Sequence, residues 1–159
     1  KEMTGSVWSD ISGLQDQITE YVVEAAEYRG NTFSSHPEYY IDYFEMRGQQ
    51  CSVLQNLHYE LKKMRKMPEQ AKIIADYILY MKEFVVEKNT PVRQLEFLDK
   101  IVKHMADTPL PVTREEFEGQ AILYHILMDL EDFLLLKKRF VENLSEQQRL
   151  IYWKTNFED

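Results

Sequence analysis

The central helix of this chain is predicted to open with Ser35-His-Pro-Glu-Tyr-Tyr-Ile-Asp-Tyr-Phe-Glu-Met-Arg47. Ser35 and Glu38 have the spacing of a capping box, and Pro37 has a φ angle already set for a first helical turn, so a helix is predicted to begin here. A stripe at helical spacing then continues for about seven turns. Its members are Tyr40, Tyr43, Phe44, Arg47, Cys51, Leu54, Leu57, His58, Leu61 and Met64. The other segments are expected to pack against this helix.

The rest of the chain also favours helix. Only five Gly and five Pro occur in 159 residues, and no segment carries a convincing strand pattern. We therefore predict an all-α fold, an up-and-down antiparallel helical bundle of about five helices, three long ones plus a shorter hairpin. Residues 1–159 are expected to form a single soluble helical domain. Within it, residues 1–29 are expected to form a helix that has no capping signal at its start, and residues 144–159 a short C-terminal helix or tail.

The last long helix has the clearest start signal. Thr113 and Glu116 have capping-box spacing, and the helix is predicted to run to about Asn143. Ser145 and Gln148 repeat that spacing before a short final helix. The inward stripe predicted for the long helix is Phe117, Ala121, Tyr124, Leu127, Met128, Leu134 and Leu135, with Glu131 and Lys138 as polar insertions.

Arg47 is the exception in the stripe of the first long helix, because it is a permanent cation at an inward position. Burial of such a group is tolerable only beside an anionic partner. Glu131 is the candidate partner, so we predict a structural ion pair between Arg47 and Glu131.

Composition and charge exclude several classes of function. The formal net charge of -8 argues against nucleic-acid binding, since a duplex-binding surface needs excess Lys and Arg. The single cysteine, Cys51, cannot form an internal disulfide, which suits a reducing compartment. No run of about 20 apolar residues is present, so no membrane span is predicted within the chain.

Catalytic and metal motifs are absent from the sequence. A di-iron bundle needs Glu-x-x-His pairs, and none occurs. There is no Gly-x-Ser-x-Gly elbow and no Gly-rich phosphate loop. We therefore predict a non-enzymatic domain with no catalytic residues, no bound metal and no cofactor.

One group of side chains suits a ligand. Tyr40, Tyr43 and Arg47 share a face, and Tyr124 could join them. Aromatic faces beside a guanidinium suit a small aromatic carboxylate. The same residues also make an ordinary core with a buried ion pair, which is the interpretation we favour.

Four strings of sequence resemble the C-terminal cytoplasmic domain of the putative aromatic acid exporter family of bacterial membrane proteins. They are His36-Pro-Glu-Tyr-Tyr-Ile-Asp-Tyr-Phe-Glu-Met-Arg47, Gln70-Ala-Lys-Ile-Ile-Ala-Asp76, Pro109-Leu-Pro-Val-Thr-Arg-Glu-Glu-Phe-Glu118 and Asp132-Phe-Leu-Leu-Leu-Lys-Lys-Arg-Phe140. Together they span most of the chain from position 36 onward, from His36 to Phe140. The resemblance supplies no established catalytic or ligand residues for this domain.

The resemblance implies a place and a role. The domain would lie on the cytoplasmic side of the bacterial cell membrane as a regulatory, ligand-sensing or assembly domain of an exporter. Its partners would be its own transmembrane domain and a second copy of itself. Two other interpretations stay open, a free-standing helical protein-interaction module and a metal-binding helical bundle enzyme.

Overall fold

The structure is a computed structural model that describes residues 9, 12–20, 23, 37–65 and 68–154. Its long elements are α2 (Pro37–Lys62), α3 (Ala71–Lys82), α4 (Val92–Ala106) and α5 (Arg114–Glu142). Residues 12–20 are also helical. The short α6 (Glu146–Gln148) and a π-helical turn, η1 (Arg149–Trp153), follow α5. The described residues contain no strand, which confirms the predicted all-α fold.

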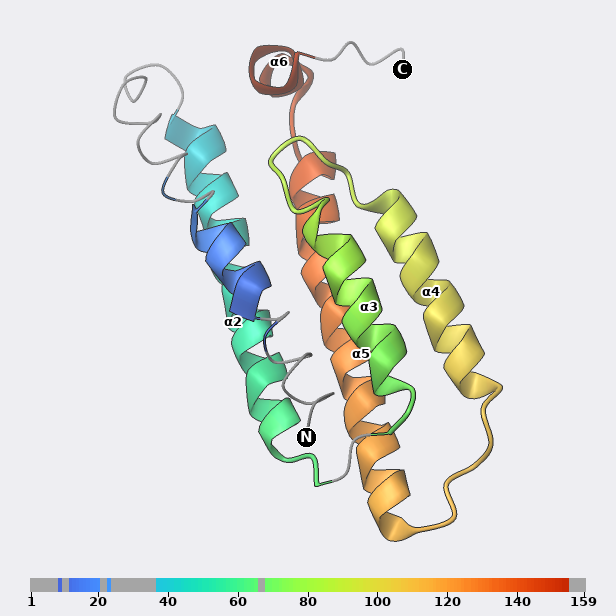
Figure 1. Cartoon of the computed structure of the whole chain (residues 1–159). Coiled ribbons are helices and arrows are strands. Elements are labelled where there is room, and N and C mark those ends of the chain that lie inside the picture. Colours follow the sequence, from blue (N-terminus) through green and yellow to red (C-terminus); the bar gives the residue numbers. More distant parts are fainter. Residues whose placement is uncertain (1–8, 10–11, 21–22, 24–36, 66–67, 155–159) are drawn as a thin grey trace.

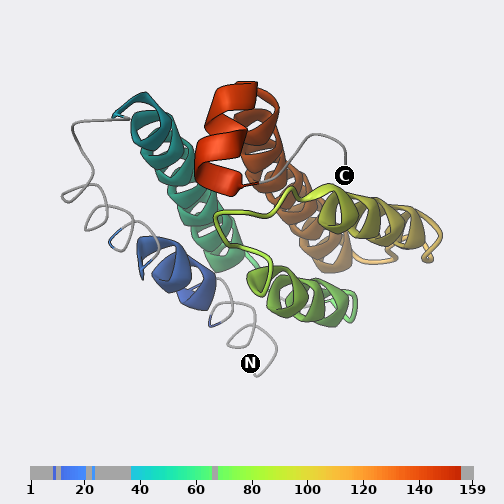
Figure 2. The same ribbon diagram turned by 90° about the horizontal axis from the view of Figure 1, so that it is seen from above.

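The helices form an up-and-down bundle. α2, α3, α4 and α5 alternate in direction, and the stretch 12–20 lies beside α2 and α3 (Figures 1 and 2). The most extensive helix contact joins α2 to α5, while α3 and α4 form the shorter hairpin packed against them. None of the helices in the described ranges is long and apolar enough to cross a membrane.

The start of α2 agrees with the predicted boundary at Pro37. Ser35, the proposed capping residue, lies outside the described residues, as do the ends of the predicted 1–29 helix. The start of α5 is confirmed in detail, because the Thr113 hydroxyl accepts from the Glu116 amide and the Glu116 side chain reaches back to the Thr113 amide. Ser145 and Gln148 make the same reciprocal pair at α6.

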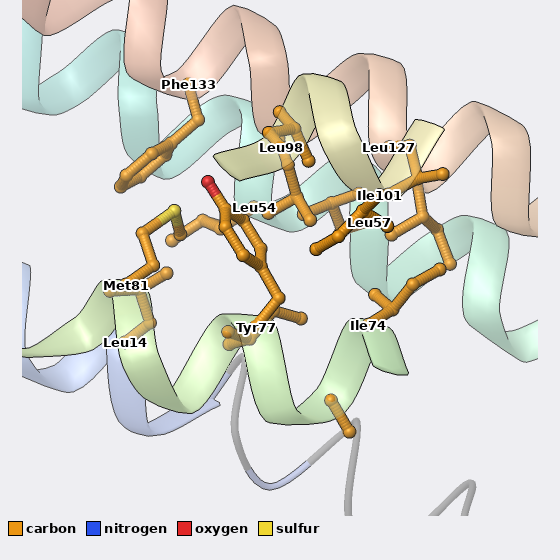
Figure 3. Close-up of a cluster of buried hydrophobic side chains, with 14 of the residues drawn as sticks. Leu14, Leu54, Leu57, Ile74, Tyr77, Met81, Leu98, Ile101, Leu127 and Phe133 are labelled. Atoms are coloured by element: carbon orange, nitrogen blue, oxygen red, sulfur yellow. The ribbon is translucent and has the colours of Figure 1, made fainter. Parts of the chain in front are cut away.

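The main core fills the middle of the bundle. Leu14 and Ile18 from the first helical stretch, Leu54 and Leu57 from α2, and Ile74 from α3 are completely buried there. Figure 3 shows side chains from these elements converging with others from α4 and α5. This burial is the main source of stability, since each such side chain contributes roughly 1.5 to 3 kcal/mol when removed from water.

The inward face of α5 differs from the predicted one. Phe117 and Met128 are 61% and 45% exposed, whereas the buried stripe is Gly119, Leu123, Ile126, Leu127, Leu130, Phe133, Leu134, Lys137, Phe140 and Val141. Apolar residues occur on more than one side of this helix, so periodicity alone allows two stripes, and packing against α2 and α4 selects one.

Candidate functional site

Buried polar side chains gather at one end of the bundle. The first turns of α2, the last turns of α5 and the link between α3 and α4 meet there (Figure 1). We call this link, residues 83–91, the hairpin link. We call the set Tyr39, Arg47, Gln50, Glu87 and Lys137 the polar end, because its members are joined by hydrogen bonds or share the same link.

Arg47 is the centre of the polar end. Its side chain is 1% exposed, and its guanidinium donates through Nε to the Tyr43 hydroxyl (3.1 Å), through Nη1 to Gln50 Oε1 (2.8 Å) and through Nη2 to the carbonyl of Val86 (3.2 Å). Gln50 in turn donates to the carbonyl of Phe133 on α5 (2.9 Å). These bonds tie α2 to the hairpin link and to α5 through neutral partners.

Lys137 on α5 is the second buried basic group. It is 4% exposed, and its Nζ donates to the carbonyls of Val86 and Glu87, both at 2.6 Å. Burial and the neighbouring Arg47 charge lower the pKa of Lys137 to about 6, against the opposing effect of Glu87. A neutral amine has two N–H groups, so the two carbonyls satisfy the form that prevails at neutral pH.

The Glu87 carboxylate accepts a hydrogen bond from Tyr39. Its Oε1 accepts from the Tyr39 hydroxyl at 2.7 Å, and that hydroxyl also accepts from Trp153 Nε1 at 3.1 Å. Burial, with the Glu87 carboxylate second, raises the pKa of Tyr39 well above its ordinary value. The phenol therefore stays protonated and links α2 to the hairpin link and to the C-terminal turn.

The charges of the polar end are not paired within the described part of the chain. No carboxylate lies within 4.0 Å of the nitrogens of Arg47 or Lys137 there. A cavity of about 10 Å³ remains between Arg47, Lys137 and the hairpin link. This volume admits about one water molecule and excludes any larger molecule unless part of the site moves.

The predicted site residues are only partly brought together. Tyr40 and Tyr43 are 5% and 1% exposed and pack in an aromatic cluster beside Arg47. Tyr124 packs against the main core instead. The predicted ion pair between Arg47 and Glu131 is wrong, because Glu131 lies on the exposed face of α5 and Arg47 is bound by Tyr43, Gln50 and the hairpin link.

Sequence reasoning missed Tyr39, Gln50 and Lys137. The inward lysine was predicted one position too late, at Lys138, which faces Glu142 at 3.7 Å near the surface. If Leu130 and Phe133 are taken as buried positions of α5, the helical spacing of three to four residues places Lys137 on the same buried face. This spacing would have identified Lys137 from the sequence. Tyr39 and Tyr40 are adjacent residues of the same type and both are buried, so the sequence did not indicate which of them joins the polar end.

Other chemistry finds little support in the same ranges. The described residues hold no group of three or more His, Cys, Asp or Glu placed to bind a metal ion. Burial raises the pKa of the Cys51 thiol, with the Arg47 charge opposing it less strongly. A thiol shifted in this direction is a poor nucleophile at neutral pH.

Comparison with known proteins gives consistent results. Residues 4–138 match the family described as "Putative aromatic acid exporter C-terminal domain". The chain is 31% identical over 136 residues to the "Uncharacterized protein YqjA" of Bacillus subtilis (strain 168), a match that covers 82% of the chain and 42% of that protein. The chain therefore spans less than half the length of this relative.

A solved structure shares the fold. The "Crystal structure of putative membrane protein from Clostridium difficile 630" superposes with a TM-score of 0.64 at 21% identity, covering 89% of this chain and 96% of that one. The all-helical architecture and the match over residues 4–138 agree with each other. The chain belongs to the family of putative aromatic acid exporter C-terminal domains.

Proposed function

We propose that this chain is a non-enzymatic regulatory domain of an exporter, which lies on the cytoplasmic side of the membrane beside its own transmembrane domain and senses carboxylates at the polar end. The family description supports the exporter part of this proposal. The sensing part is supported by the polar end alone.

The observation that carries the sensing role is the charge balance around Arg47. The guanidinium is almost fully buried, and its described partners are a phenol, an amide and a backbone carbonyl. Among the described residues no carboxylate pairs with this cation, so it has exchanged its hydration for neutral hydrogen bonds, which is costly. A carboxylate would supply the missing charge and fit the fork of the guanidinium.

Binding of this kind would change the structure. Arg47 and Lys137 both hold the hairpin link through its carbonyls, at Val86 and Glu87. A carboxylate that takes over these donors releases the link from α2 and α5. The α3–α4 hairpin can then shift relative to the long helices, which gives two arrangements that a ligand biases, as regulation requires.

Calorimetry tests the proposal directly. Benzoate is titrated into the wild-type chain, with benzamide as the uncharged analogue of similar shape. We expect saturable binding of benzoate and none of benzamide, because the guanidinium recognises the charge. The Arg47→Met variant should bind benzoate at least tenfold more weakly, while Arg139→Met, which removes an exposed cation from α5, should bind like wild type.

Circular dichroism must show that the variants are folded. If Arg47→Met does not fold, Arg47→Lys keeps the charge but loses the fork, and a weaker affinity is again expected. Undiminished binding in a folded Arg47 variant, or no binding of benzoate to the wild-type chain, would refute the sensing role.

A further inference from the structure

The residues that follow α5 fold back over the polar end. Residues 144–153, which we call the C-terminal cap, turn after α5 and are fixed by the Ser145 capping box and by a hydrogen bond from Arg149 Nη2 to the carbonyl of Val141 (2.8 Å). In Figure 1, α6 lies at the same end of the bundle as the start of α2 and the end of α5. The cap is therefore placed to cover side chains of both helices.

Two rings of the C-terminal cap lie on the polar end. The Tyr152 ring stacks on Tyr39 with centroids 3.9 Å apart and an angle of 6° between the planes, and it meets the edge of Tyr40 at 5.5 Å. Trp153 donates through Nε1 to the Tyr39 hydroxyl. Both cap rings remain only half-buried, so the cap contributes aromatic surface from the solvent side.

The Trp153 ring also lies near the buried amine. Lys137 Nζ is 5.7 Å from the centroid of the indole. Tyr39 thus offers a flat aromatic surface and a hydroxyl, and Lys137 offers an amine close by. The cap rings lie against these groups. The cavity of about 10 Å³ between Arg47, Lys137 and the hairpin link is too small for a ring. An aromatic molecule that stacks on Tyr39 beside Lys137 would therefore take the place of the half-buried cap rings.

We propose that Tyr152 and Trp153 occupy the binding place of a planar aromatic carboxylate, which would stack on Tyr39, set its carboxylate beside Lys137 Nζ and displace the C-terminal cap. This inference rests on the proposed function and assigns it a binding place. The ligand ring replaces the Tyr152 stack with a stack of the same kind. Its carboxylate favours the protonated form of Lys137, so the amine takes up a proton from water and gains a third N–H, which donates a charged hydrogen bond to the carboxylate. This bond replaces the contact between indole and amine.

Displacement of the cap is measured in the wild-type chain by hydrogen exchange with and without benzoate. We expect benzoate to speed exchange of the amides of residues 146–153 several-fold, and benzamide to leave it unchanged. The same opening is followed by fluorescence in a Trp8→Phe background, where Trp153 is the only indole left, because the chain has two tryptophans. Benzoate should shift the Trp153 emission to longer wavelength as the ring enters water.

Competition by the cap is measured with variants. Tyr152→Ala removes the competing stack, which is worth about fivefold in affinity, so benzoate should bind about fivefold more tightly. Tyr152→Phe keeps the stacked ring and should bind like wild type. Ile151→Ala, which shortens an exposed side chain of the same turn, is the matched control and should also bind like wild type.

The outcomes separate this inference from the proposed function. If benzoate binds in an Arg47-dependent manner but the cap amides and Trp153 do not respond, the binding place under the cap is refuted and the sensing role stands. Equal or weaker binding by Tyr152→Ala has the same meaning. If benzoate binds neither the wild-type chain nor any of the variants, both proposals are refuted. The exchange experiment needs no variant, so an unfolded mutant cannot prevent the decision.

Discussion

The middle of the bundle and its polar end are both buried but are held together in different ways. In the middle, Leu54, Leu57 and Leu127 are fully enclosed by other apolar side chains. The Tyr77 hydroxyl there is satisfied by one carbonyl, that of Gln94, at 2.7 Å. At the polar end, Arg47 and Lys137 depend on several partners contributed by other segments.

This difference teaches where the molecule can respond to its surroundings. Apolar contacts do not depend on pH or on the presence of an anion, and their strength follows the area removed from water. The stability that buried basic groups contribute depends on both the pH and the presence of an anion. Protonation and a countercharge change the free energy of such groups by amounts comparable with the stability of a domain. We therefore expect the middle to fix the fold and the polar end to carry the response.

The largest effect is expected in the middle. Leu57→Ala removes a completely buried side chain and leaves a cavity, so the free energy of unfolding should fall by about 3 kcal/mol. The loss should be the same at pH 7 and pH 9. Urea unfolding measures it, and Leu110→Ala at an 88% exposed position is the control. A loss below about 1 kcal/mol would show that the middle is less tightly packed than described.

The next largest effect on the free energy of unfolding comes from Lys137 in the polar end and depends on pH. The pKa of Lys137 is lowered from 10.5 to about 6 in the folded chain. Between these values the unfolded chain holds a proton that the folded chain lacks, so stability rises with pH by about 1.4 kcal/mol per unit. From pH 7 to pH 9 the gain should be about 3 kcal/mol.

A variant isolates this contribution. Lys137→Met should remove most of the rise between pH 7 and pH 9, whereas Arg139→Met should keep it. His58, whose pKa is lowered by burial, is neutral throughout this range and does not contribute. Urea midpoints across the pH series provide the measurement, and an equally steep rise in Lys137→Met would contradict the assignment.

A smaller loss is expected when the hydrogen bonds between α2 and α5 are cut. Gln50→Leu keeps a side chain of similar size, removes the additional hydrogen bond to the carbonyl of Phe133 and leaves the buried Arg47 Nη1 without its partner. Leaving such groups unsatisfied should cost about 2 kcal/mol in thermal or urea unfolding. Gln49→Leu at the neighbouring exposed position should be close to neutral. If both variants were equally stable, the polar network would contribute nothing to the fold.

The smallest effects compare the two capping boxes. Thr113→Ala at the start of α5 should lower the global free energy of unfolding by about 1 kcal/mol. Ser145→Ala should leave global stability nearly unchanged but speed hydrogen exchange in the C-terminal cap, because that segment opens locally. Equal global losses in the two variants would mean that the cap and the bundle unfold as one unit.

Much of the fold could be predicted because its signals are local. The capping boxes at Thr113 and Ser145 need only a spacing of three residues. The buried stripe of α3, including Ile74, Ile78 and Met81, follows directly from helical periodicity, because only one side of that helix is strongly apolar.

The candidate site could be predicted only in part because its key contacts are not local. The inward position of Arg47 was visible, but its partner in the hairpin link is a backbone carbonyl, at Val86. Every residue has a carbonyl, so such a partner leaves no mark in the sequence. The search for an acidic side chain therefore led to Glu131, which is exposed. The choice of Lys137 over Lys138 depended on how α5 packs.

The central claim is that the polar end holds a basic group that burial keeps neutral and that a carboxylate would charge. Nuclear magnetic resonance of the Lys137 side chain, titrated from pH 5 to pH 11 with and without benzoate, tests it most directly. We expect a midpoint near pH 6 without benzoate, moving upward when benzoate is present. A midpoint near 10.5 under both conditions would contradict it.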